Sequence, residues 1–202
     1  MKNVMWKGQL QATINIDTII KKQNLCGLGP VEYLRGEVMI IDGKCYKSEV
    51  INDSIKVSET YNLKAPFFGY TNVEKWEEVE SLPIIITLEQ LEKFINKSSK
   101  KHKRPFFFKI LAIVDTANIH VMDLPLGTVV TSPDIAHASG QKKFIITNKE
   151  VEIIGFFSTE HKSILTHHDT FMHLHLITKD KNQMGHLDSV FFKNATIKLY
   201  FQ

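Results

Sequence analysis

The stretch Phe171-Met-His-Leu-His-Leu-Ile-Thr178 decides how this chain is interpreted, because it has the pattern of a β-strand that carries two histidines. Side chains alternate between the two faces of a strand, so His173 and His175 project from the same face. The opposite face carries Met172, Leu174 and Leu176. We therefore expect a strand with one apolar face and one face that presents a pair of imidazoles.

A third histidine follows at the spacing of a return strand. Residues 178–185 are polar and end in a glycine, as a reversal between two strands should. A strand that starts at His186 brings a third imidazole beside His173 and His175. Three protein ligands leave coordination positions open, which is typical of a catalytic zinc site. Neutral imidazole also suits copper, iron or nickel.

A simpler interpretation of the histidines stays open. Histidines on the solvated face of a sheet need no metal, and a single His-x-His pair is weak evidence for one. His167 and His168 are adjacent, so a strand would send them to opposite faces, and we interpret them as loop residues.

The segments around this strand predict the fold class. Strand-like runs dominate the sequence after residue 105, whereas helix signals cluster before residue 100. This segregation favours an α+β fold with a mixed, mostly antiparallel β-sheet and a few helices mainly in the N-terminal half. The strands expected in the second half are 106–114, 118–122, 127–131, 143–148, 151–157, 170–178, 186–192 and 195–201.

The first half carries fewer signals. Asp42-Gly43 lies between the runs 37–41 and 44–47, which predicts a tight hairpin. Thr87-Leu-Glu-Gln90 resembles a capping box and opens a helix that runs to about Asn96. The other elements expected here are a strand at 10–16, a short helix at 18–23 capped by Asp17 and ended before Gly27 and Gly29, a strand at 66–73, and a solvated helical patch around Trp76.

A polar, basic run at 97–104 is the best candidate for an internal boundary. We expect residues 1–202 to form a single unit with two candidate halves: 1–100, α+β and carrying Glu37, and 105–202, strand-rich and carrying the histidines. The apolar final strand, 197–201, resembles an exposed sheet edge. Such an edge predicts pairing with a second copy, as a homodimer.

Composition excludes several classes of protein. The 202 residues include 25 Lys and Arg against 22 Asp and Glu, and a net charge of +3 is too mild to imply nucleic acid as a partner. No apolar run is long enough for a membrane helix. The chain starts without the apolar segment of a signal peptide and has two cysteines, Cys26 and Cys45, so we expect a cytoplasmic protein with reduced thiols.

Two segments together resemble the alpha-acetolactate decarboxylases, zinc enzymes that form acetoin. The metal motif of that family is His-x-His, ten residues and a further His, and here it stands as His173-Leu-His175 and then Met-Gly-His186-Leu-Asp188. Far upstream, residues 27–47, GLGPVEYLRGEVMIIDGKCYK, are similar to a family run with the same Gly-Glu pair and Asp-Gly turn. Pro66-Phe67 and residues 107–113 also fit the family, in the same order.

The resemblance implies roles for the matching positions. His173, His175 and His186 would hold Zn²⁺, and Glu37 would be an active-site carboxylate near the metal. The implied reaction is decarboxylation of acetolactate or a similar 2-hydroxy-3-oxo acid, a small-molecule substrate, to give acetoin. The zinc ion would act as a Lewis acid, and a positioned acid would then protonate the carbon.

The sequence also departs from the family. The family holds the substrate carboxylate with an arginine, and residues 122–131, which correspond to that segment, contain none. The family also carries a glutamate in its C-terminal tail, where Asp188 is the one acid present here. Lysine reproduces the two parallel hydrogen bonds of an arginine poorly, so these losses predict a slower reaction. Arg35 lies two residues from Glu37 and either shares its face or points to solvent.

Three functions therefore remain open from the sequence. The favoured one is the zinc-dependent carboxy-lyase, with Glu37 handling the proton. The alternative is a metal-binding relative of the family that has lost or changed this activity. A zinc hydratase or hydrolase with a metal-bound hydroxide shares the ligands but has no support beyond the histidines.

Overall fold

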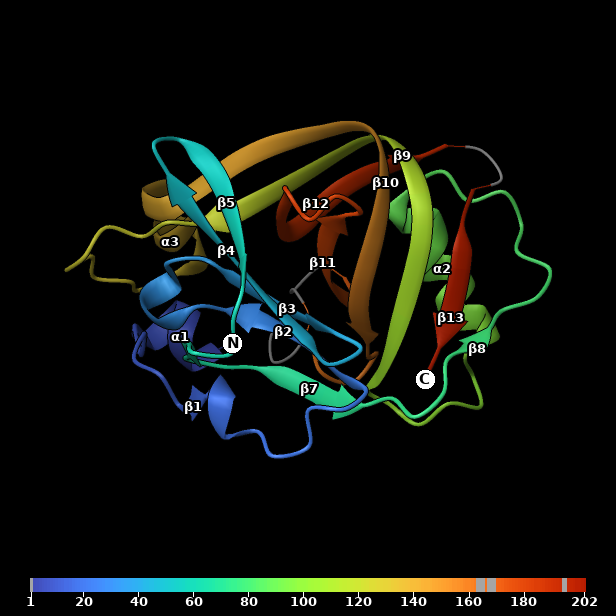
Figure 1. The fold of residues 1–202 in the computed structure, drawn as a ribbon, viewed down its shortest axis with the longest axis horizontal. Coiled ribbons are helices and arrows are strands. Elements are labelled where there is room, and N and C mark those ends of the chain that lie inside the picture. The colour runs from blue at the N-terminus through green and yellow to red at the C-terminus, as the bar shows by residue number, and fades with distance from the viewer. Residues whose placement is uncertain (1, 163–165, 167–169, 194–195) are drawn as a thin grey trace.

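The computed structural model describes residues 2–162, 166, 170–193 and 196–202, which form two antiparallel sheets that pack on each other (Figure 1). A short ribbon of β1 (Ile14–Asn15) and β6 (Lys64–Ala65) packs on the first sheet. The first sheet runs in the spatial order β5 (Ser54–Glu59), β4 (Lys44–Ile51), β3 (Glu37–Ile41), β2 (Leu25–Pro30) and β7 (Gly69–Asn72).

The second sheet closes on itself in part. Its order is β10 (Gln141–Phe157), β11 (Met172–Thr178), β12 (Met184–Phe192), β9 (Phe106–Met122), β13 (Lys198–Phe201) and β8 (Glu77–Glu78). Because β10 also pairs with β9, the strands β9, β10, β11 and β12 form a ring. Figure 1 shows β9 and β10 as two long, curved strands that run side by side. The predicted α+β fold with mostly antiparallel strands is confirmed.

The helices are short and lie outside the two sheets. The capping box expected at Thr87 is present, since its side chain accepts from the backbone N–H of Gln90 and the Gln90 side chain accepts from Thr87. None of the helices in the described part of the chain is long and apolar enough to span a membrane. The helices are α1 (Lys2–Lys7), α2 (Leu88–Ser98) and α3 (Pro133–Gly140), with 3₁₀ turns at η1 (Ile16–Thr18) and η2 (Glu32–Leu34).

The two faces of the second sheet have different partners, as the alternation in β11 predicts. One face belongs to the largest apolar cluster, which α2 covers with Leu91 and Ile95 and which includes Met172, Leu174 and Leu176. The other face packs on the first sheet through a second apolar cluster that joins Met39 of β3 to Phe156 of β10. The face of β11 that carries histidines therefore lies between the two sheets.

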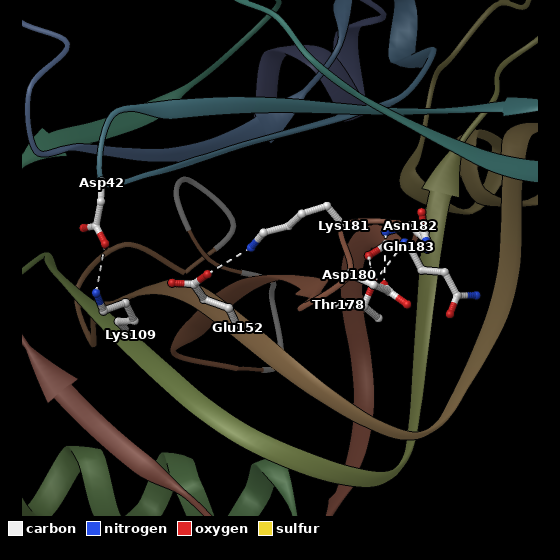
Figure 2. A network of polar contacts seen from close by, with 8 residues as sticks. All are labelled: Asp42, Lys109, Glu152, Thr178, Asp180, Lys181, Asn182 and Gln183. Atoms are coloured by element: carbon white, nitrogen blue, oxygen red, sulfur yellow. Dashed lines mark hydrogen bonds and ion pairs between the residues drawn. The ribbon is translucent and has the colours of Figure 1, made fainter.

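A polar contact also joins the two sheets at one end. Asp42, in the turn between β3 and β4, accepts a hydrogen bond from the Lys109 ammonium of β9 at 3.1 Å (Figure 2). The indole N–H of Trp76 donates to the other oxygen of Asp42 at 2.9 Å. Trp76 is thus a half-buried residue just before β8 (Glu77–Glu78). The charged residues around it are exposed, as predicted, but the prediction that they are helical is wrong.

Several predicted boundaries differ from those observed. The hairpin at Asp42-Gly43 is confirmed, but the helix predicted at 18–23 is replaced by the 3₁₀ turn η1, which the Asn15 side chain caps. Gly27 and Gly29 do not end a helix. They lie inside β2, where a Cβ atom on either would meet Phe68 or the neighbouring backbone at 2.6–2.7 Å. These glycines allow the close approach of two chain segments.

In the second half, the strands predicted at 106–114 and 118–122 are one strand, β9, and those at 143–148 and 151–157 are also one, β10. Residues 127–131 form no strand. The final strand, β13, is not a sheet edge, because it pairs with β9 on one side and with β8 on the other. The argument from an exposed edge therefore fails, and the homodimer stays a prediction without that support.

Gly155 generates a prediction about stability. A Cβ atom there would lie 2.4 Å from Cδ2 of Leu174 and 2.9 Å from the carbonyl oxygen of His173. The substitution Gly155→Ala must push β10 and β11 apart, and we expect it to lower the free energy of unfolding by about 1–3 kcal/mol. Urea unfolding measures this. Thr147→Ala, at an exposed position of the same strand, should change stability by less than about 0.5 kcal/mol. Equal stability of Gly155→Ala and wild type would contradict the prediction.

Candidate metal and active site

Three neighbouring strands place a row of histidines between the sheets. His175 of β11 lies opposite His186 of β12, and His186 lies opposite His120 of β9. Residues directly opposite each other project from the same face of a sheet. His173, two positions before His175, shares that face. All four side chains are buried.

The turn between β11 and β12 holds this register (Figure 2). The Thr178 hydroxyl donates to the Asp180 carboxylate at 2.6 Å, and the Asn182 N–H donates to the same oxygen at 3.2 Å. The Gln183 N–H donates back to the Thr178 hydroxyl at 3.1 Å. The return strand begins at Met184, two residues before the predicted start. A turn fixed at both ends cannot slip by one residue, and such a slip would turn His175 or His186 to the opposite face.

The structure brings together the three histidines that the sequence singles out. The ring centroids of His173 and His186 are 5.0 Å apart, those of His173 and His175 are 5.4 Å apart, and those of His175 and His186 are 5.7 Å apart. The three rings come from two adjacent strands and lie close together between the sheets. His167 and His168 lie outside the described residues.

Glu37 reaches the same volume from the first sheet. Its strand begins directly after Gly36. Only glycine fits at this position, because φ is +132° and an added Cβ atom would lie 2.3 Å from the Ser48 carbonyl oxygen. One carboxyl oxygen of Glu37 accepts from the Met122 N–H at 3.2 Å. The other lies 3.6 Å from Nε2 of His175.

Burial sets the electrostatics of Glu37. The residue is 3% exposed, and desolvation raises the pKa of its carboxyl group well above the ordinary value of 4.5. The hydrogen bond from Met122 acts in the opposite direction, and the negative charge of Asp188 adds to the rise. Glu37 is therefore a buried carboxyl group beside the histidines.

His120 and Asp188 complete the cluster, and sequence reasoning missed this pair. Asp188 Oδ1 lies 2.7 Å from Nδ1 of His120 and 3.4 Å from Nδ1 of His186. Burial raises the pKa of Asp188, but the contacts with the two histidines outweigh burial and lower the pKa overall. The His120 and His186 rings stack with centroids 4.6 Å apart. The partners lie 68 residues apart, so no local spacing reveals them.

A cavity opens between the sheets at this cluster. Its lining combines imidazoles, one carboxyl group and apolar side chains, and among the described residues that line it there is no lysine or arginine. The lining residues are Met5, Pro30, Leu34, Glu37, Phe67, His120, Met122, His137, His173 and His186.

The two arginines lie elsewhere. Arg35 is exposed and forms an ion pair with Asp123 at 3.8 Å. Of the two positions expected for Arg35, the structure therefore shows the one that faces solvent. The Arg104 guanidinium lies over the Phe157 ring, 4.7 Å from its centroid. Neither arginine lines the cavity.

Two overlapping sets of side chains could hold a metal ion. His120, His186 and Asp188 offer ligand atoms that lie within 4.8 Å of one another. His173, His175 and His186 offer three imidazoles, and the two sets share His186. Both donor sets suit a transition metal such as zinc, since imidazole and carboxylate are its ordinary ligands.

Comparison with known proteins agrees with this architecture. A curated alpha-acetolactate decarboxylase from Brevibacillus brevis is 25% identical over 198 residues, which cover 98% of this chain and 66% of that protein. The chain thus spans slightly less than two thirds of the length of this relative.

Solved structures show the same fold. An acetolactate decarboxylase from Bacillus subtilis subspecies spizizenii matches all of this chain and 83% of its own, with a TM-score of 0.79 and 18% identity. A Staphylococcus aureus protein of unknown function, similar to alpha-acetolactate decarboxylase, matches 96% of this chain and 79% of its own, with a TM-score of 0.75 and 18% identity. The family model described as alpha-acetolactate decarboxylase matches residues 1–201, and the chain therefore belongs to the alpha-acetolactate decarboxylase family.

Proposed function

We propose that this chain decarboxylates acetolactate, or a closely similar 2-hydroxy-3-oxo acid, to acetoin, with a zinc ion held by His173, His175 and His186. Family membership supports the class of reaction. The observation that carries the proposal is the proximity of three buried imidazoles to one another and to the buried carboxyl group of Glu37.

The donor set fits a catalytic zinc ion. Three imidazoles leave coordination positions for a chelating hydroxy acid, whereas a structural zinc site is closed by a fourth protein ligand. Asp188 lies 3.4 Å from Nδ1 of His186. A carboxylate at this position can orient a histidine that binds a metal ion. A bound zinc ion would supply Lewis-acid polarisation of the substrate oxygen atoms.

The reaction needs a proton at a defined carbon. Decarboxylation breaks the bond between the carboxylate carbon and C2, and the electron pair spreads from C2 onto the neighbouring carbonyl oxygen as carbon dioxide leaves. C2 must then receive a proton to give acetoin. Glu37 can deliver it, because the Met122 N–H holds one carboxyl oxygen and leaves the other facing the histidines.

The apolar part of the lining has its own role. Leu34, Phe67 and Met122 border the cavity together with the polar groups. Apolar walls keep bulk water from the carbanion-like centre, and they strengthen electrostatic contacts within the site.

One observation favours the alternative, a metal-binding relative with a changed or lost activity. Among the described residues that line the cavity, no cation is available to hold a substrate carboxylate. Assay of the wild-type chain with acetolactate separates the two functions.

A homodimer and a cytoplasmic location stay predictions, and the free, buried state of Cys26 and Cys45 supports a reducing compartment.

The metal assignment predicts the zinc content of variants. We expect roughly one zinc ion per wild-type chain after dialysis. His175→Ala should lose most of its zinc, because only two of the three imidazole ligands remain. Inductively coupled plasma mass spectrometry measures the zinc content. His102→Asn is the matched control, since His102 packs on Phe106 and Phe201 away from the cavity. Zinc retained in His175→Ala but lost in Asp188→Asn would place the ion among His120, His186 and Asp188 instead.

The role of Glu37 predicts a selective loss of rate. Glu37→Gln keeps the size of the side chain and the acceptor for Met122 but removes the transferable proton. We expect acetoin formation from acetolactate to fall by about 100-fold or more, with unchanged zinc content. The control is Glu49→Gln, because Glu49 pairs with Lys47 on β4 outside the cavity. A wild-type chain that holds zinc but forms no acetoin would favour the alternative function.

A further inference from the structure

His120 lines the cavity and takes no part in the function proposed above. The residue is 4% exposed, and its ring stacks on the His186 ring. Its Nδ1 atom lies 2.7 Å from Asp188 Oδ1, and this is the one hydrogen bond of the His120 ring within the described residues. Because Asp188 engages Nδ1, the ring nitrogen left for the cavity is Nε2.

Asp188 defines what Nε2 can do. From the 2.7 Å contact between the imidazole and the carboxyl group we assign Nδ1 of His120 as the donor and Asp188 as the acceptor. In the neutral imidazole, Nε2 is then an acceptor. Asp188 thus fixes both the tautomer and the orientation of the ring, as outer carboxylates do for histidines in metal sites.

A 2-hydroxy-3-oxo acid brings one matching group into the cavity. Its carboxylate and ketone oxygen atoms accept hydrogen bonds, whereas its 2-hydroxyl group can donate one. Apart from Glu37 and the histidines, the described lining is apolar. The other lining histidine outside the proposed ligands, His137, lies on α3, with its ring centroid 6.1 Å from that of His120.

We propose that His120 is a substrate-contacting residue whose Nε2 accepts a hydrogen bond from the 2-hydroxyl group of the bound acid, while Asp188 is the positioning residue that holds the ring. The identity of the ligand rests on the proposed function. His120 thereby selects acids with a 2-hydroxyl group over acids that lack it.

The test uses two unreactive acids and the zinc-loaded, full-length chain. The first acid, 2,3-dihydroxy-2-methylbutanoate, carries the 2-hydroxyl group and has no ketone, and the second, 3-hydroxy-2-methylbutanoate, lacks the 2-hydroxyl group. Titration calorimetry gives the dissociation constant of each acid. The ratio of the two constants is compared between wild type and variants, so that contributions common to both proteins cancel, as in a double-mutant cycle.

Two substitutions separate the two nitrogens of His120. His120→Asn keeps an N–H near the position of Nδ1 for Asp188 and removes Nε2, and we expect it to lower the preference for the hydroxylated acid roughly five- to tenfold, the effect of one hydrogen bond. His120→Gln extends an amide toward the position of Nε2 and should restore part of the preference. The control, His102→Asn, should leave the ratio unchanged.

Each result decides the inference. An unchanged ratio in His120→Asn at full zinc content overturns it, and so does a wild-type chain that binds the two acids equally or binds neither. Loss of zinc from His120→Asn also overturns it, because His120 would then support the ion. Failure of the proposed function is distinct: a wild-type chain that forms no acetoin but discriminates the two acids through His120 refutes the reaction and keeps the contact.

Discussion

The antiparallel register of β11, β12 and β9 is the constraint on which the rest of the site depends. It aligns His175, His186 and His120 across three strands, on the face opposite the large apolar cluster. A shift of one residue would bury imidazoles among phenylalanines and expose leucines to the cavity, and both changes are costly. Two features exclude that shift. The polar turn from Thr178 to Gln183 fixes the connection between the strands, and the ring of strands pairs β11 and β12 on both sides.

The second requirement is that the two sheets meet at this face. Glu37 belongs to the first sheet, yet it accepts its hydrogen bond from Met122 of the second. Its carboxyl group is therefore held in position only when the two sheets pack on each other. The apolar cluster around Met39 and Phe156 forms that contact between the sheets. The site is therefore complete only when the two sheets are packed on each other.

The local features of this architecture are readable from the sequence, and the long-range ones are not. The alternation in β11, the Asp42-Gly43 hairpin and the capping box at Thr87 depend on residues close in the chain. The sequence predicts two strands where the structure has β9, because Asp115 and Thr116 interrupt the apolar pattern. Pairing with β10 nevertheless continues the strand through these residues. No local pattern indicates a role for His120, because its partner Asp188 lies 68 residues away in the chain. The start of α3 is different, because a local signal for it is present in the sequence. Ser132 is the N-cap, and Pro133 and Asp134 follow in the first turn.

The lack of a lysine or arginine in the described cavity lining has a specific energetic meaning. A cation beside the substrate carboxylate stabilises a charge that is present before the reaction and disappears as carbon dioxide forms, so much of its effect falls on binding. The negative charge moves instead to the oxygen next to C2. Groups placed at that oxygen stabilise the transition state more than the ground state, and these are the ones that raise the rate. For the proposed reaction, a site built from imidazoles, one carboxyl group and apolar walls would keep the groups that act on the migrating charge and lack the one that acts on the starting carboxylate.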